Sequence, residues 1–169
     1  MNVRKRFGSV LVIGALAVIG FAKPAAAQIG GGVSFLTNGG TGAGFAVNAA
    51  KDHWAHGSFS FAPTGDFSYH SNDGAHSTTY GGGVRANWHI ANARNLQPFG
   101  EFLAGGIHLS SCDGCGSDNA FQLTYGAGVH IPMSPKWNLL AQFDIITAMR
   151  DDATDSGFRM TFGASVPWK

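Results

Sequence analysis

The C-terminal stretch from Phe158 to Trp168 alternates strictly between apolar and other residues, and this alternation constrains the fold more than any other feature. The apolar positions are Phe158, Met160, Phe162, Ala164, Val166 and Trp168. Successive side chains of a β-strand point to opposite faces, so the pattern predicts a strand whose two faces meet different surroundings. The function of the protein then depends on which surroundings each face meets.

Similar alternation recurs along the chain and predicts eight strands, with no helical apolar stripe after the N-terminal segment. The predicted strands cover Ile29 to Thr37, a stretch through Phe45 and Val47 to Lys51, Phe59 to Tyr69, Tyr80 to Ile90, Pro98 to Leu109, Phe121 to Ile131, Trp137 to Ile145 and Phe158 to Trp168. Between strands we expect a tight turn at Pro132 to Lys136 and longer polar loops at His70 to His76, Ser110 to Asn119 and Arg150 to Ser156.

Two strands carry predicted irregularities. Pro63 lacks a backbone donor, and it predicts a bulge or an edge irregularity in the third strand. In the fifth strand Glu101 shares a face with Phe99 and Leu103, which predicts either a bulge or a mixed interior.

The first 27 residues are predicted to be a cleaved secretory signal peptide. Arg4, Lys5 and Arg6 precede an apolar run from Phe7 to Phe21, and small residues lead to a cleavage site after Ala27. The apolar run is short for a spanning helix of about 20 residues, although an uncleaved inner-membrane anchor is the alternative. Residues 28–169 are then expected to form one domain.

Eight alternating strands without a helix predict an all-β fold, a single antiparallel up-and-down barrel, because closure removes exposed strand edges. Two kinds of barrel fit the alternation. A soluble exported barrel of the lipocalin type keeps apolar residues inside around a small apolar ligand. A transmembrane barrel turns them toward lipid and keeps polar residues inside.

The scarcity of charge favours the transmembrane barrel. Charged residues make up 12% of the chain and the formal net charge is +1, whereas a water-facing surface carries about 25–35% charged residues. The same balance gives no basic surface for nucleic acid. The clear strand charges comprise two of each sign, and we predict that they pair in a polar network inside the barrel: Arg85, Glu101, Asp144 and Arg159.

The aromatic residues give a second, independent indication. If the N-terminus lies in the periplasm, the four tryptophans fall at periplasmic strand ends: Trp54, Trp88, Trp137 and Trp168. The other predicted girdle then contains Tyr69, Tyr80, Phe121 and Phe158 at the outer ends. Girdles at both interfaces are typical of transmembrane barrels, so we predict a location in the bacterial outer membrane.

The C-terminus also carries a family motif. Outer-membrane barrels end in an assembly signal with a polar residue, a glycine, an apolar residue and an aromatic, which Thr161, Gly163, Val166 and Trp168 match. On these residues the mature chain resembles the small eight-stranded outer-membrane β-barrel proteins of the OmpA/OmpX-like group. It departs from the motif in Lys169, which follows the aromatic, and in Pro167.

The resemblance implies insertion by the outer-membrane assembly machinery, but it implies no single activity. We expect contacts with outer-membrane lipid and lipopolysaccharide, a monomer, and a structural or surface-interaction role that is not enzymatic. A soluble lipocalin-like carrier is the alternative, and a small pore would need an open lumen.

Other candidate chemistry has a simpler interpretation. Cys112 and Cys115 predict a small loop disulfide in an exported protein rather than a metal site. The segment His70-Ser71-Asn72 is faintly similar to the His-x-Ser-Asn element of outer-membrane lipid-A deacylases, but one residue is missing. The aspartates of the loop from Arg150 to Ser156 lack the spacing of an EF-hand. We therefore predict no catalytic residue, no cofactor and no metal.

Overall fold

The computed structural model describes residues 27–37, 41–51, 54–90, 96–110, 117–150 and 153–168. Its strands are β1 (Ala27–Thr37), β2 (Thr41–Lys51), β3 (Trp54–His56), β4 (Phe59–Asn72), β5 (Ala75–Trp88), β6 (Gln97–Ser110), β7 (Ser117–Ser134), β8 (Trp137–Met149) and β9 (Thr154–Trp168). Within these ranges no helix is long and apolar enough to cross a membrane. The predicted signal peptide lies outside the described residues except for Ala27, which begins β1.

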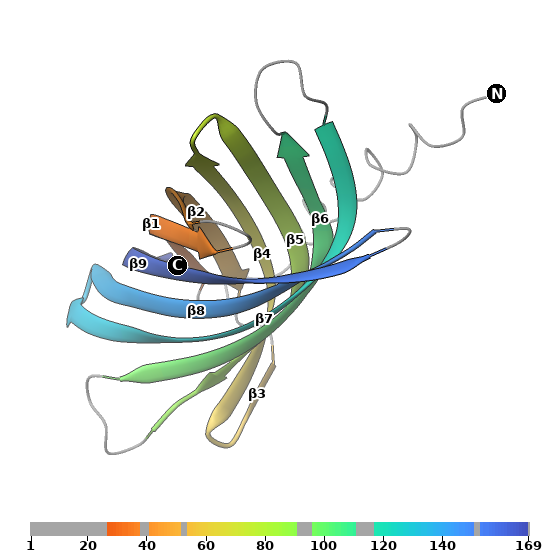
Figure 1. The fold of residues 1–169 in the computed structure, drawn as a ribbon. Helices are drawn as coiled ribbons and strands as arrows, with labels where there is room; N and C mark the ends of the chain where they lie inside the picture. Colours follow the sequence, from red (N-terminus) through yellow and green to blue (C-terminus); the bar gives the residue numbers. More distant parts are fainter. Residues whose placement is uncertain are drawn as a thin grey trace.

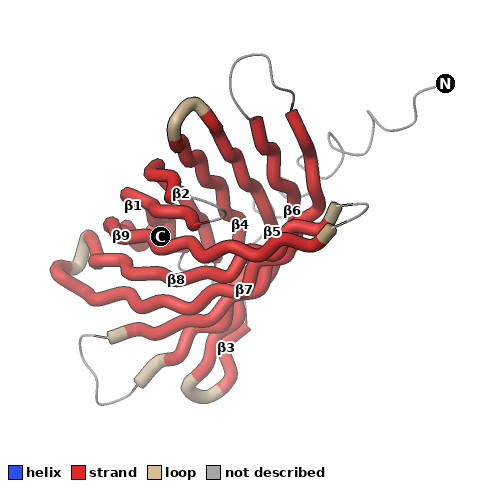
Figure 2. Tube along the Cα trace, viewed as in Figure 1, coloured by secondary structure: helices blue, strands red, loops and turns tan. Residues whose placement is uncertain are grey.

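The strands form a closed antiparallel barrel (Figures 1 and 2). Neighbouring long strands pair in chain order, and β1 closes the ring by pairing with β9 from Ala27 opposite Trp168 to Thr37 opposite Phe158. β2 pairs with the outer part of β4, and the three-residue β3 pairs with the start of β4. The eight long strands therefore confirm the predicted eight-stranded barrel, with β3 as a short addition.

The two faces of the wall have the predicted orientation. Outward-facing Phe162 and Val84 expose 55% and 48% of their surface, whereas inward-facing Arg159 and Gln122 expose 1% and 2%. A soluble barrel would bury the apolar set and expose the polar set. This barrel does the reverse, as transmembrane barrels do.

For each of the two predicted irregularities, at Pro63 and at Glu101, the structure selects one of the two alternatives. β4 keeps an unbroken register with β5, but on its other edge the described pairings with β3 end at Phe61 and those with β2 begin at Thr64, so the neighbouring strand changes at Ala62 and Pro63. Pro63 thus marks an edge irregularity and not a bulge. In β6 the register is also unbroken, and Phe99, Glu101 and Leu103 all point inward, so the interior is mixed.

The predicted polar loop from His70 to His76 is wrong. β4 continues to Asn72 and β5 begins at Ala75, so that Asp73 and Gly74 alone make the turn. Both have positive φ, 45° and 82°, as a type I′ hairpin requires. The Asp-Gly pair therefore fixes a tight hairpin in which the flanking polar residues belong to strands.

Other predicted boundaries also shift. β7 extends through Pro132 to Ser134, with a register irregularity between these two residues, and Pro135 and Lys136 form the turn. β9 begins at Thr154, inside the predicted loop from Arg150 to Ser156. The fourth predicted strand, β5, ends at Trp88 rather than at Ile90.

Pairing places the four tryptophans at one end of the barrel. Trp54 and Trp88 lie opposite Phe61 and Phe59 near the start of β4, Trp137 begins β8, and the backbone of Trp168 lies opposite Ala27. Trp54 is exposed, as are Trp88 and Trp137, and the side chain of Trp168 lies outside the described part of the structure. Tyr80, Phe121 and Phe158 are exposed toward the other end, where Tyr69 is half-buried.

Candidate functional site

The inward residues of five neighbouring strands form one row across the barrel wall. In register, Arg85 on β5 lies opposite Glu101 on β6, Glu101 opposite Gly126 on β7, Gly126 opposite Asp144 on β8, and Asp144 opposite Arg159 on β9. The structure therefore brings all four charged residues of the predicted network together. Residues in one row of a sheet stand close enough for their side chains to interact.

Arg85 and Glu101 make the first ion pair of this row. Nε and Nη2 of Arg85 both donate to Oε2 of Glu101, at 2.9 and 2.7 Å, and both side chains are fully buried. The Arg85 guanidinium also lies 4.1 Å from the centre of the Phe99 ring, which stacks on His130 at 4.8 Å. Phe99 thus packs against a cation inside the barrel, which explains why an aromatic shares the face of Glu101.

Arg159 makes the second and more extended set of contacts. Its Nε donates to Oδ2 of Asp144 at 2.7 Å, and its Nη1 donates to Oδ1 of Asp66 at 2.6 Å and to Oγ of Ser68 at 3.0 Å. Asp66 and Ser68 lie on β4, with β1 and β2 between β4 and β9 in the ring. One guanidinium therefore connects separate parts of the wall through the interior.

Asp66 is a member of the network that the sequence reasoning missed. A signal for it existed, because its position alternates with outward-facing Phe61, Phe67 and Tyr69, which predicts an inward side chain. Asp66 is 8% exposed and the three carboxylates face two guanidinium groups. In their ionised forms these five groups leave the interior with one net negative charge.

Gln142 joins the two ion pairs. Its Nε2 donates to Oε1 of Glu101 at 2.8 Å and to Oδ1 of Asp144 at 2.9 Å, and its Oε1 accepts from Nδ2 of Asn48 at 3.2 Å. Gly126 provides the space, since a Cβ there would overlap Oδ1 of Asp144 and lie 2.9 Å from Cγ of Glu101. A neutral amide thus bridges two anions that a side chain on β7 would separate.

Polar pairs fill the interior on both sides of this row. His70 Nε2 lies 2.9 Å from Ser34 Oγ, which lies 3.1 Å from Thr161 Oγ1. Toward the other end, His130 Nδ1 lies 2.9 Å from Ser165 Oγ. Buried apolar side chains complete the packing: Leu36, Leu103, Ile107, Leu140 and Ile146. The charged residues of this row, which we call the central row, are all buried: Arg85, Glu101, Asp144 and Arg159.

The serine–histidine pairs inside the barrel do not form a hydrolytic site open to lipid. Both pairs are buried, and a nucleophilic serine also needs an orienting partner for its base and access for a substrate. In the segment His70-Ser71-Asn72 the side chains of His70 and Ser71 lie on opposite faces of β4, because His70 is buried inside the barrel and Ser71 is exposed. Across the described ranges no group of three or more histidine, cysteine, aspartate or glutamate side chains could hold a metal ion.

The remaining predicted residues have separate positions. Thr161 is buried beside Ser34, and Val166 is 52% exposed on the outer wall. Gly163 lies opposite Gly32, and a Cβ on Gly163 would overlap the carbonyl oxygen of Gly31, so close strand contact requires glycine here. The predicted disulfide residues, Cys112 and Cys115, lie outside the described residues.

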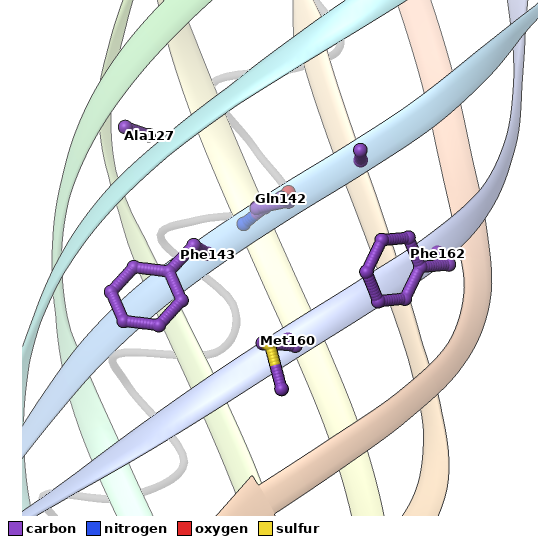
Figure 3. Close-up of a pocket in the computed structure, with 6 residues that line it drawn as sticks. Ala127, Gln142, Phe143, Met160 and Phe162 are labelled. Carbon is purple, nitrogen blue, oxygen red and sulfur yellow. The ribbon is translucent and has the colours of Figure 1, made fainter.

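The outer wall carries a shallow apolar groove over β7, β8 and β9 (Figure 3). Its lining combines the small Ala127 and Ala141 and the polar Gln142 with the larger apolar side chains of Phe143, Met160 and Phe162. All three larger side chains are exposed on the face that the alternation turns outward.

No family model matches this chain, and no curated protein matches it. Solved structures do. The attachment invasion locus protein Ail of Yersinia pestis has a TM-score of 0.55 at 18% identity over 85% of this chain and 97% of Ail. Neisserial surface protein A has a TM-score of 0.58 at 13% identity over 85% and 96%. The outer membrane enzyme PagL has a TM-score of 0.55 at 14% identity over 83% and 99%. The chain thus has the fold of the small eight-stranded outer-membrane β-barrels, as its sequence resemblance predicted.

Proposed function

We propose that the protein is an integral outer-membrane barrel that acts as a rigid, non-enzymatic support with a structural or surface-interaction role. The observation that carries this proposal is the Arg159 guanidinium, which binds Asp144 and Asp66 inside a barrel whose outer wall is apolar. Ionised groups in the interior and aromatic groups on the outside suit a wall that faces lipid. They do not suit a soluble carrier, which needs an apolar lumen for its ligand.

The central row argues for a barrel that does not conduct ions. Arg85, Asp144 and Arg159 expose 0%, 0% and 1% of their surface, and their partners come from several strands. An eight-stranded barrel is just wide enough for side chains to fill. We therefore expect no steady conductance from the wild-type protein.

Ion pairs at the outer end support a surface role, because they hold the strand ends that carry the connections. Nε of Arg150 lies 3.0 Å from Oδ2 of Asp118, and its Nη1 lies 3.2 Å from Oδ2 of Asp155. These residues come from the end of β8 and the starts of β7 and β9. Contact with lipopolysaccharide and insertion by the assembly machinery as a monomer are parts of the same proposal.

Three measurements on the full chain, produced in a Gram-negative host, test the proposal. We expect the protein to stay in the detergent-extracted outer membrane, to migrate differently in gels before and after boiling, and to give no steady current in planar bilayers. Recovery in the soluble periplasmic fraction would overturn the membrane assignment. A steady current would overturn the closed interior.

The non-enzymatic part needs its own assay, because PagL has the same fold and is an enzyme. Purified protein is incubated with lipid A in detergent, and the lipid is analysed by mass spectrometry. We expect its mass to stay unchanged. Release of an acyl chain that is lost in Ser71→Ala would contradict the proposal.

A further inference from the structure

We propose that a cluster of four outward-facing side chains, Phe45, Phe67, Tyr69 and His76, binds a phosphorylated lipid of the outer leaflet. This inference rests on the proposed outer-membrane location and adds a specific lipid site to it. We call these four residues the Tyr–His cluster. The cluster lies on β2, β4 and β5, on the wall rather than in the lumen.

The rings of the cluster form a continuous surface. The centroid of the Phe45 ring lies 6.2 Å from that of Phe67 and 6.0 Å from that of Tyr69. The Tyr69 ring stacks on the His76 imidazole at 5.7 Å, with 21° between the planes. Phe45 and Phe67 expose 47% and 43% of their surface. Rigid exposed rings of this kind offer a flat apolar contact to an acyl chain.

The outer end of the cluster is polar and its orientation is fixed. Tyr69 Oη lies 2.8 Å from Nδ1 of His76. When the tyrosine hydroxyl donates to Nδ1, the opposite nitrogen, Nε2, carries the proton and is a donor. Among the described residues Nε2 of His76 has no partner, whereas its ring is held by both stacking and the hydrogen bond. In this arrangement, which the proposal adopts, the cluster presents a positioned N–H donor next to its apolar surface.

The surroundings of this donor favour an anionic oxygen. In register, Tyr69 lies opposite Phe45 and Thr78, and His76 lies opposite Ser71 and Ser110. None of these four cross-strand neighbours is acidic and three of them carry hydroxyl groups; the acidic residue of the hairpin is Asp73, in the turn three positions before His76. A phosphate accepts from imidazole and hydroxyl donors, and the rings below it contact the acyl chains of the same molecule. The site is continuous with the apolar wall, so its occupant is a membrane lipid.

A second histidine at the same end provides a matched control. Nδ1 of His108 lies 2.8 Å from Oδ1 of Asn119, on β6 and β7, and this pair is also exposed. Unlike His76, His108 has no ring contact within the described residues. Because its Nδ1 donates to the amide oxygen of Asn119, Nε2 of His108 is an acceptor in the neutral ring, so His108 is an exposed histidine that lacks both the N–H donor and the aromatic surface of His76.

The experiment uses the full mature chain in phosphatidylcholine nanodiscs, with lipid A as the probe. In the wild type, lipid A is expected to shift the ring nitrogen signal of His76, and affinity in every variant is measured from the ring signals of Phe45 and Phe67 in phenylalanine-labelled protein, which all variants keep. We expect His76→Ala to weaken binding about fivefold, which is the effect of losing one good hydrogen bond. We expect Tyr69→Phe to weaken it less, His76→Gln to recover part of the affinity, and His108→Ala to leave it unchanged.

Two further arms separate the sources of the signal. Dephosphorylated lipid A is expected to bind more weakly than lipid A, and free inorganic phosphate is expected to leave the His76 signal in place. Equal affinity in His76→Ala and the wild type, or equal losses in His76→Ala and His108→Ala, would overturn the proposal. Either result leaves the membrane location intact, since insertion is read independently from the gel shift on boiling.

Discussion

Arg159 on β9 and Asp66 on β4 meet at 2.6 Å inside the barrel, although 93 positions separate them in the sequence. The same guanidinium also binds Asp144 on the neighbouring strand at 2.7 Å. All three side chains are almost completely shielded from solvent. A buried charge of this kind is stable only while its partner is present, because removing one member of the ion pair leaves the other as an uncompensated buried charge.

Arg159→Leu is expected to lower the free energy of unfolding by about 3–5 kcal/mol, because it leaves two buried carboxylates without their cation. The measurement is the urea midpoint of the refolded barrel together with the gel shift on boiling. Arg150→Leu is the control, since the ion pairs of Arg150 with the described residues Asp118 and Asp155 are exposed, and such pairs are worth about 0–1 kcal/mol. Equal midpoints for the two variants would show that the interior network does not stabilise the fold.

Glu101→Leu should be strongly destabilising, and adding Arg85→Met to it should restore much of the loss. The Glu101→Leu change leaves the fully buried Arg85 without the carboxylate to which its Nε and Nη2 both donate. Replacing a whole buried ion pair by apolar side chains is often nearly neutral. Denaturant midpoints of the two single variants and the double variant give the coupling energy. A double variant that is no better than the worse single one would contradict the pairwise account.

Gly126→Ala is expected to destabilise the barrel by about 1–3 kcal/mol, as overpacking does, because its methyl group would enter the space between Asp144 and Glu101. Gly100→Ala is the matched control on the adjacent strand, where a Cβ would lie at an ordinary 3.8 Å from the carbonyl oxygen of Gly126. Thermal melting in detergent compares the two. The same loss in both variants would mean that glycine is needed for backbone reasons and not for the network.

Gly163→Ala tests whether the glycine of the predicted assembly signal is also needed for packing. Gly32 lies opposite it, and a Cβ on either residue would overlap the backbone of the neighbouring strand. We expect both Gly163→Ala and Gly32→Ala to lower the yield of refolding into lipid vesicles without any assembly machinery. If both variants refold normally and only Gly163→Ala fails to assemble in cells, the residue acts as a recognition signal alone.

The alternation of apolar and polar residues was enough to predict the architecture and the direction of each face. Arg159, Asp144 and Arg85 could be assigned to the interior because each occupies a polar position between outward apolar ones, whereas Glu101 shares its face with Phe99 and Leu103 and was assigned by its charge. This inference is local, since the two-residue period of a strand is set by the backbone. It required no knowledge of which strands are neighbours.

Partners across the interior could not be predicted in the same way. Asp66 contacts Arg159 because barrel closure places β4 and β9 around one lumen, and alternation carries no information about that relationship. Gln142 bridges two carboxylates only because Gly126 lacks a side chain. The loop predicted from His70 to His76 differs from the observed hairpin at Asp73 and Gly74 for another reason. Inward-facing strand residues in a barrel are polar, so polarity near a turn no longer distinguishes strand from loop.

The pairing of β1 with β9 has a consequence for how the cylinder is made. Its first and last strands form the seam, so an incomplete chain is an open sheet with two bare edges. The strand that seals this seam also delivers Arg159, which binds Asp66 of β4 across the lumen and Asp144 of the neighbouring strand β8. Sealing the wall and joining Asp66 to Asp144 through one guanidinium are therefore a single event, and reopening the ring would separate a buried ion pair.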